Sequence, residues 1–406
     1  MRKYWKFTAI IVVIVLSIGT FYVSTSTSAE QYPEFVIQTL DGNAEEIEPL
    51  VLEGSYTDTS SMNYVSTNLK ITSEGSIYNS RSFLDQVIGQ PPTVIKALQE
   101  EYRTFMRGKT SWVDLYFENS QFLAYVDVNY KMGSLRSSDF KFDISLLNKE
   151  DDNINSFKLE VPKERELEHI IVEDVQMVED ELYIITQNMM RNNDDSYDEK
   201  HIYRIDIANQ KISNHEAIIQ VPTGQVNTYT NVRLIGTSPT KANEHLIIVK
   251  TEEKVVEETE STRVEDIKQE IISYNIATKE KERINVPDLR LKENQLSFFD
   301  GSTIYFTKLD GQELVVTPYS LVDDQVGQVF SIQLSSETDN VQVPLITVKY
   351  GKLYAAASRK SSTVNADVIV ADVKTGETLF KGQLALENSS EEKGNFELNM
   401  HEIFVK

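Results

Sequence analysis

Tyr203-Arg204-Ile205-Asp206-Ile207-Ala208-Asn209 has the pattern of a β-strand that runs into a turn, and its recurrence predicts the fold. Similar strand-turn stretches recur at residues 273–278 and 370–376. Strands rich in Val, Ile, Tyr and Phe suit a pleated, half-buried surface. Tyrosine-containing strands of this kind occur at residues 182–185, 304–306 and 353–355.

Val-Pro pairs close successive units of this pattern. They stand at Val161-Pro162, Val221-Pro222, Val286-Pro287 and Val343-Pro344. The intervals are 60, 65 and 57 residues, and a fixed period with several strands per unit is typical of a blade array. We therefore predict an all-β fold, a β-propeller of six or seven blades with seven favoured. The clear units cover residues 112–162, 170–222, 232–287, 296–334 and 343–386.

The recurring short strands with the Tyr-x-Ile-Asp-Ile-x-Asn turn resemble the blades of bacterial β-propeller proteins of the broad quinoprotein/WD40-like class. The resemblance covers roughly residues 111–386 and is architectural. The chain has no Trp-Asp blade signature, and Trp5 and Trp112 are its only tryptophans. The resemblance therefore implies no cofactor, and it assigns no functional residue.

The two ends of the chain are predicted to share a blade. Residues 35–40 resemble the second strand of a later unit but lack a preceding tyrosine strand. Residues 400–405 could supply that inner strand, which would remove an open sheet edge.

The amino terminus carries a segment that can engage a membrane. Arg2, Lys3 and Lys6 precede an apolar run over residues 7–23, and a small-residue cleavage site could end at Ala29. The segment is either a retained signal anchor or a cleaved signal peptide. We predict a division into residues 1–29, the signal segment, and residues 30–406, a propeller outside the cytoplasm. The protein is then single-pass in the cell membrane, or alternatively secreted.

One helix interrupts the strands, within an insertion at about residues 82–108. Residues 94–107 have helical periodicity, with Thr93 as a plausible N-cap and Gly108 as a plausible stop. The apolar face either packs over the strands or docks a protein partner. The residues assigned to partner binding are Ile95, Leu98, Tyr102, Phe105 and Met106.

Long polar stretches separate the tyrosine strand from the next strand of the same unit. They cover residues 188–200, 251–269 and 359–365, and we predict elongated, mostly acidic loops on one face. For residues 251–269 an extended hairpin and a charged helix both remain open.

Composition excludes several classes of function. The net charge is −23, from 63 acidic and 40 basic residues, which argues against nucleic-acid binding. The chain has no cysteine, so thiol catalysis and disulfides are impossible. No two of the five histidines have the short spacing of a zinc motif, and no nucleophile elbow or phosphate loop occurs.

Calcium is the most plausible ion, and no other cofactor is predicted. Oxygen ligands occur together at residues 192–195, at residues 151–153 and at Asp323-Asp324, although none of these stretches matches a calcium-binding loop. Solvated acidic loops explain the same residues. We assign no catalytic, cofactor-binding or metal-binding residue.

These features favour a non-enzymatic, membrane-anchored module outside the cytoplasm, which binds, senses or regulates in the bacterial cell envelope. Its partner would be a protein of the membrane or envelope. The alternative is an exported carbohydrate-active enzyme that uses channel carboxylates on envelope polysaccharide. A secreted structural or adhesion protein is a third possibility if cleavage occurs at Ala29.

Overall fold

A computed structural model describes most of the chain beyond the amino-terminal region. The described residues are 10, 12–20, 32–59, 65–78, 91–133, 136–162, 166–178, 181–192, 195–223, 228–235, 242–257, 262–286, 289–291, 294–334, 344–358, 364–387 and 396–406. They fall into two compact units, here called unit 1 (residues 1–90, 309–314 and 330–406) and unit 2 (residues 91–308 and 315–329).

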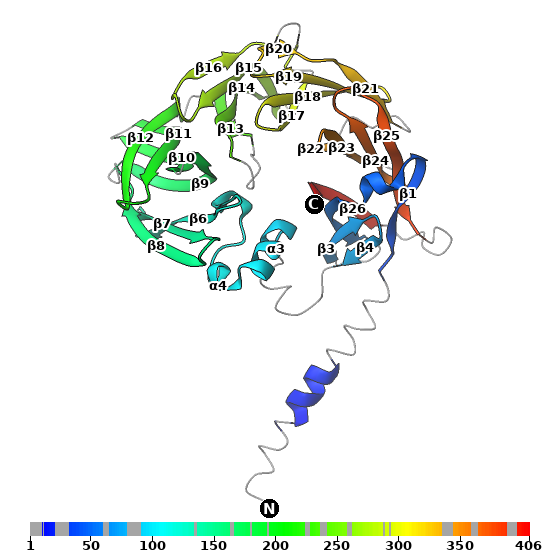
Figure 1. The fold of residues 1–406 in the computed structure, drawn as a ribbon, viewed down its shortest axis with the longest axis horizontal. Coiled ribbons are helices and arrows are strands. Elements are labelled where there is room, and N and C mark those ends of the chain that lie inside the picture. Colours follow the sequence, from blue (N-terminus) through cyan, green and yellow to red (C-terminus); the bar gives the residue numbers. More distant parts are fainter. Residues whose placement is uncertain are drawn as a thin grey trace, which may run out of the picture. The chain divides into compact units, whose positions relative to one another are not determined.

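Unit 2 contains three complete antiparallel sheets, each built from four consecutive strands (Figure 1). The first consists of β5 (Tyr116–Glu118), β6 (Phe122–Lys131), β7 (Ser138–Asn148) and β8 (Asn153–Glu160). The second consists of β9 (Leu167–Val178), β10 (Glu181–Asn192), β11 (Asp195–Asp206) and β12 (Lys211–Pro222). The third consists of β13 (Thr228–Leu234), β14 (His245–Glu257), β15 (Thr262–Asn275) and β16 (Lys281–Ile284).

A fourth sheet lies largely in unit 2. This sheet has five strands. β17 (Gln295–Phe299), β18 (Thr303–Asp310), β19 (Glu313–Ser320) and β20 (Gln325–Val326) follow one another in the sheet, and β21 (Phe330–Gln333) also pairs with β19. These four sheets match the first four units expected from the sequence, and sheets of consecutive antiparallel strands are what a β-propeller blade requires.

Side chains on β10 show why these strands form. Leu182 and Ile184 enter one hydrophobic core, which the β5–β8 sheet shares, and Tyr183 and Ile185 enter another, which the β13–β16 sheet shares. Successive side chains of a strand point to opposite faces, so an unbroken apolar run is buried on both sides. Burying each of these side chains contributes about 1.5–3 kcal/mol.

Unit 1 contains two sheets that each combine strands from both ends of the chain. One has the order β1-β25-β24-β23-β22, and blue β1 lies beside orange-red β25 in Figure 1. The other has the order β26-β2-β3-β4. The bounds are β1 (Phe35–Gly42), β2 (Leu50–Asp58), β3 (Val65–Thr72), β4 (Gly75–Tyr78), β22 (Leu345–Lys349), β23 (Lys352–Ser358), β24 (Val364–Asp372), β25 (Thr378–Leu386) and β26 (Phe396–Val405), with the 3-10 helix η1 (Ala44–Ile47) after β1.

Both chain ends therefore contribute strands to sheets, but the prediction that residues 35–40 and 400–405 share one blade is wrong. β26 takes the first position of its sheet beside β2, whereas β1 joins the other sheet as a fifth strand. The β26–β2 register shifts between Glu53 and Gly54. A Cβ on Gly54 would lie 2.7 Å from the carbonyl oxygen of Asn399, so only glycine allows this close approach.

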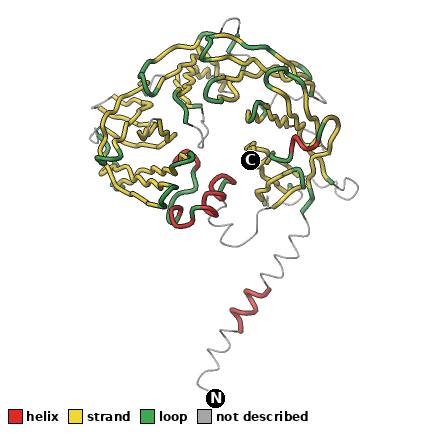
Figure 2. Tube along the Cα trace, in the orientation of Figure 1, coloured by secondary structure: helices red, strands yellow, loops and turns green. Residues whose placement is uncertain are grey.

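The described residues thus form six sheets, and a seventh blade is not among them. Strands dominate the trace and helices are few (Figure 2).

The prediction of an acidic loop at residues 188–200 is wrong. β10 and β11 continue into it and pair as far as Asn192 with Asp195. Three of its polar residues, Asn188, Glu199 and Lys200, are buried on the sheet. Residues 251–269 are likewise an extended hairpin, paired as far as Glu257 with Thr262. Most of residues 359–365 lie outside the described residues.

The predicted helix at residues 94–107 is two helices, α3 (Thr93–Glu101) and α4 (Arg103–Met106), followed by the 3-10 helix η2 (Val113–Leu115). Tyr102 separates them with φ −114° and ψ 49°, which is outside the helical region. Pro92, not Thr93, takes the N-cap position, without a side-chain cap. Gly108 does end the segment, with φ +76°.

At the amino terminus, residues 10 and 12–20 are helical. In the described part of the chain, no helix is long and apolar enough to cross a membrane. The flanking Arg2, Lys3 and Lys6, and the predicted cleavage point Ala29, lie outside the described residues.

Candidate functional site

A row of polar side chains crosses one face of the β9–β12 sheet. Asn188 lies on β10, Glu199 and His201 on β11, and His215 and Gln220 on β12. Residues two apart on a strand share a face, and register places Glu199 opposite both Asn188 and Gln220. Strand pairing therefore gathers these groups although they span more than 30 positions of sequence.

Glu199 is the centre of this row. It is 1% exposed, and its Oε1 accepts hydrogen bonds from His201 Nδ1 at 2.8 Å and Asn188 Nδ2 at 3.3 Å. Its Oε2 accepts from Gln220 Nε2 at 3.0 Å. Burial raises the pKa of Glu199, but the hydrogen bonds from His201 and Gln220, the charge of His201 and the Asn188 amide outweigh burial and hold the pKa below its ordinary value. The carboxylate is thus kept ionised inside the sheet.

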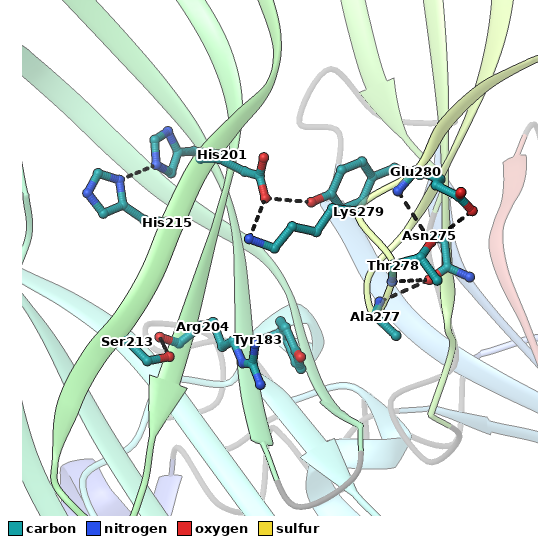
Figure 3. Close-up of polar contacts among 12 residues, drawn as sticks. Tyr183, His201, Arg204, Ser213, His215, Asn275, Ala277, Thr278, Lys279 and Glu280 are labelled. Carbon is teal, nitrogen blue, oxygen red and sulfur yellow. Dashed lines mark hydrogen bonds and ion pairs between the residues drawn. The ribbon is translucent and has the colours of Figure 1, made fainter.

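Two histidines continue the row: His201 is buried and His215 is half-buried, and Figure 3 shows the contact between their rings. His201 Nε2 lies 3.1 Å from His215 Nδ1, and the rings stack with centroids 5.3 Å apart. His201 also stacks on Tyr203 at 4.5 Å. Because an ionised carboxylate only accepts, His201 donates its Nδ1–H to Glu199, and one proton lies between His201 Nε2 and His215 Nδ1. The hydrogen-bonded series Glu199–His201–His215 can hold a proton. Its side chains already have hydrogen-bond partners within the protein, so none of them is free for a ligand.

A second polar group lies between this sheet and the β13–β16 sheet. Glu216 accepts from Tyr274 OH at 3.1 Å and forms an ion pair with Lys279 Nζ at 3.3 Å. The charge of Glu216, together with burial as the larger cause, raises the pKa of Tyr274. The space these residues enclose is about 10 Å³, which is at most one water. This contact therefore joins two sheets and leaves no room for a ligand.

An open cleft lies between the β5–β8 and β9–β12 sheets. Its volume is about 570 Å³, within the range of small-molecule sites. Strand ends and turns of both sheets form its walls. It is lined by Gln121, Phe122, Leu146, Asn148, Asn153, Asn155, Met177, Glu181, Ile205, Asp206, Ile207 and Ala208.

The polar lining of this cleft, which we call the interblade cleft, consists of four amides and two carboxylates. Asn148 Oδ1 accepts from the Glu150 backbone N–H at 2.9 Å, and Asn155 Oδ1 accepts from Gln210 at 3.4 Å. The side-chain amides of Gln121 and Asn153 make no hydrogen bond to any residue that the structure describes, and both residues are exposed. These amides remain available to a ligand.

No family model matches the chain, and no curated protein matches it either. Among solved structures, the similar ones include β-propeller-type folds. The β-propeller domain of the trilobed protease from Pyrococcus furiosus is 10% identical, with 85% of this chain and 84% of that one covered and a TM-score of 0.33.

Two further likenesses are of the same kind. An oligogalacturonate lyase in complex with manganese is 9% identical, with 89% of this chain and 86% of that one covered and a TM-score of 0.38. A Synechocystis apocarotenoid oxygenase is 7% identical, with 91% of this chain and 96% of that one covered and a TM-score of 0.41. Likeness at this level carries no argument about function, which must come from the chain's own side chains.

The structure places the five residues assigned to partner binding in a core. Ile95, Leu98, Phe105 and Met106 are buried in the cluster shared by the β5–β8 and β9–β12 sheets, and Tyr102 packs against it. The packing interpretation of the helix explains these side chains. A partner-docking role for them stays a prediction, and it would require the helices to detach.

Two of the acidic stretches considered for calcium, at residues 151–153 and 323–324, serve turns, and Asn193 and Asp194 of the third lie outside the described residues. Asp151 accepts from the Asn153 backbone N–H at 3.1 Å, Asp323 accepts from Ser320 Oγ at 3.0 Å, and Asp324 accepts from Tyr319 OH. Among the residues that the structure describes, no group of three or more His, Asp or Glu side chains could hold a metal ion.

Sequence reasoning missed both the polar row and the interblade cleft. The histidine spacing does not predict contact of His201 with His215, and the polar pattern at residues 188–200 predicts a loop for Asn188 and Glu199. One local signal was present: Glu199, His201 and Tyr203 alternate as they would on one face of a strand. Their partners across the sheet follow from register, which no local pattern reveals.

Proposed function

We propose that the protein is a non-enzymatic binding module of the cell envelope and that the interblade cleft is its binding surface. The observation that carries this proposal is the cleft itself: about 570 Å³ of open space bordered by the unengaged amides of Gln121 and Asn153. Rigid sheets hold these groups at strand ends, where binding residues on such scaffolds are commonly placed.

The state of the cleft carboxylates supports binding over turnover. Glu181 accepts from Arg204 and from Tyr183 OH at 3.0 Å. Asp206 accepts from the Asn209 backbone N–H at 3.0 Å and from its Nδ2 at 2.7 Å, and these bonds hold the pKa of Asp206 below its usual value. A glycosidase acid needs the opposite, a carboxyl with a raised pKa. Asp206 is therefore an acceptor and no proton donor.

The amino-terminal segment supports the proposed location. A basic end at Arg2, Lys3 and Lys6 followed by an apolar run over residues 7–23 suits an anchor that leaves residues 30–406 outside the cytoplasm. The partner would be a component of the membrane or envelope, and the net charge of −23 disfavours anionic lipid head groups.

Hydrogen exchange tests this proposal. Full-length protein in nanodiscs is measured with and without a solubilised cell-envelope fraction. We expect slower exchange at the cleft, in peptides that cover Phe122 and the start of β8, because a bound ligand restricts local opening. The double variant Gln121→Ala, Asn153→Ala should lose this protection. Gln325→Ala, which removes an exposed amide far along the chain, should keep it.

Protection elsewhere on the chain, or equal protection in the double variant, would contradict a role for the cleft. Degradation of a polysaccharide in the same fraction, abolished by Glu181→Gln, would favour the exported carbohydrate-active enzyme instead.

A further inference from the structure

The interblade cleft has a chemistry that selects among ligands. Its side-chain amides come from Gln121, Asn148, Asn153 and Asn155, and each amide both donates and accepts hydrogen bonds. Hydroxyl groups also donate and accept. Four amides at one opening therefore suit a ligand that presents several hydroxyls.

The two carboxylates of the cleft are already compensated. Glu181 forms an ion pair with Arg204, and Asp206 takes two N–H groups from Asn209. They attract a cation only weakly, yet each retains lone pairs that accept further hydrogen bonds. No lysine or arginine is among the residues that line the cleft, so an anionic ligand would find no counter-charge.

The rest of the lining is apolar. Leu146, Met177 and Ile205 are buried beneath the opening, and Phe122 and Ile207 are half-buried at its walls. A pyranose ring has an apolar C–H face and a rim of hydroxyls, which matches an apolar floor with a polar edge.

We infer that the interblade cleft binds an uncharged saccharide, as a segment of an envelope polysaccharide. This inference rests on the proposed function and names its ligand class. Affinity comes from hydroxyl-to-amide hydrogen bonds and from contact of the sugar ring with the apolar floor, and the compensated carboxylates serve as acceptors.

Isothermal titration calorimetry of the full-length protein in nanodiscs tests the inference. The probes are a glucose tetramer and an N-acetylglucosamine tetramer as uncharged saccharides, a galacturonate tetramer as an anionic one, and tetralysine as a cationic peptide. At least one uncharged tetramer should bind, and the galacturonate tetramer should bind at least tenfold more weakly.

Variants locate the binding. Gln121→Ala and Asn153→Ala should each weaken binding about threefold to tenfold, and the double variant about tenfold or more, since each removes one exposed hydrogen-bonding group. Both side chains are exposed and unpaired among the described residues, so folding is not at stake. Gln325→Ala should leave the affinity unchanged.

Three results would overturn the inference: no heat from either uncharged tetramer, equal affinity in the double variant, or tighter binding of tetralysine or the galacturonate tetramer. The envelope-fraction experiment separates the two claims. If that fraction protects the cleft but no uncharged tetramer binds, the saccharide inference is contradicted and the proposed binding function is kept. Failure of both experiments removes the proposed function as well.

Discussion

Glu199 shows how a buried charge is accommodated in this chain. Its three donors come from β10, β11 and β12, so the carboxylate is satisfied by the sheet that buries it. Buried charges are tolerated only when paired and hydrogen-bonded. The row from Asn188 to His215 therefore fixes the register of three strands as well as carrying a proton-holding chain.

Replacing Glu199 with glutamine should lower the free energy of unfolding by about 2–4 kcal/mol. Glutamine keeps the shape, but it loses the charge and places an N–H₂ group where an acceptor is needed. Denaturant unfolding measures the change. Glu313→Gln, an exposed carboxylate on β19, is the matched control and should change stability by less than about 0.5 kcal/mol. An unchanged free energy of unfolding in Glu199→Gln would contradict the role assigned to this carboxylate.

The same carboxylate predicts a pH dependence. The folded-state pKa of Glu199 is lowered from the ordinary 4.5, so its contribution to stability is complete above that pH and is lost as pH falls through the folded pKa. Stability measured from pH 6 to pH 3 should therefore fall less steeply in Glu199→Gln than in the parent protein. Identical slopes would show that the folded pKa is not lowered.

Among the elements, α3 and α4 illustrate the limit of an amphipathic pattern. The periodicity identified an apolar face at residues 94–107 but not what covers it. The core of the β5–β8 and β9–β12 sheets does so. Tyr102 leaves the helical region where its ring lies against that core, with Lys149 Nζ 5.1 Å from the ring centroid.

We expect Ile95→Ala to destabilise the protein by about 2–5 kcal/mol, because Ile95 is fully buried and the change leaves a cavity. Thermal unfolding by circular dichroism reports the loss. Lys96→Ala, on the exposed side of the same helix, should stay within about 0.5 kcal/mol of the parent. Equal stability of the two variants would mean that α3 does not pack as described.

At the scale of the whole molecule, the chain ends are built into the sheets of unit 1. β26 pairs with β2 along its length, Val405 is buried, and Phe396 stacks on Tyr56 with centroids 5.7 Å apart. This arrangement leaves no open edge on β2, as β-sheet proteins commonly require.

Deleting residues 396–406 should therefore expose the edge of β2 and unfold the β26-β2-β3-β4 sheet. Hydrogen exchange should show protection lost in peptides of β2 and β3, whereas peptides of β6 and β10 in unit 2 keep theirs. Glu397→Ala, an exposed position on β26, is the control and should leave protection intact. Retained protection of β2 in the deletion variant would contradict closure by β26.

The amino-acid pattern alone predicted a series of β-sheets, and the five predicted units agree with five of the six sheets of the described residues. The alternation of apolar and polar side chains and the presence of turn residues are local properties. A strand such as the one before Asn209 can therefore be predicted from a short stretch of sequence. The sequence also excluded thiol chemistry, because the chain has no cysteine.

The contacts of the polar residues follow from tertiary structure and have no local pattern in the sequence. The bonds from Glu199 to Asn188 and Gln220, and the meeting of Gln121 with Asn153 at one cleft, depend on strand register and on how two sheets face each other. Register is set by the summed burial of whole strands. A short polar stretch therefore has the same pattern whether it becomes a solvated loop or, as with β10 and β11, paired strands that bury Asn188, Glu199 and Lys200.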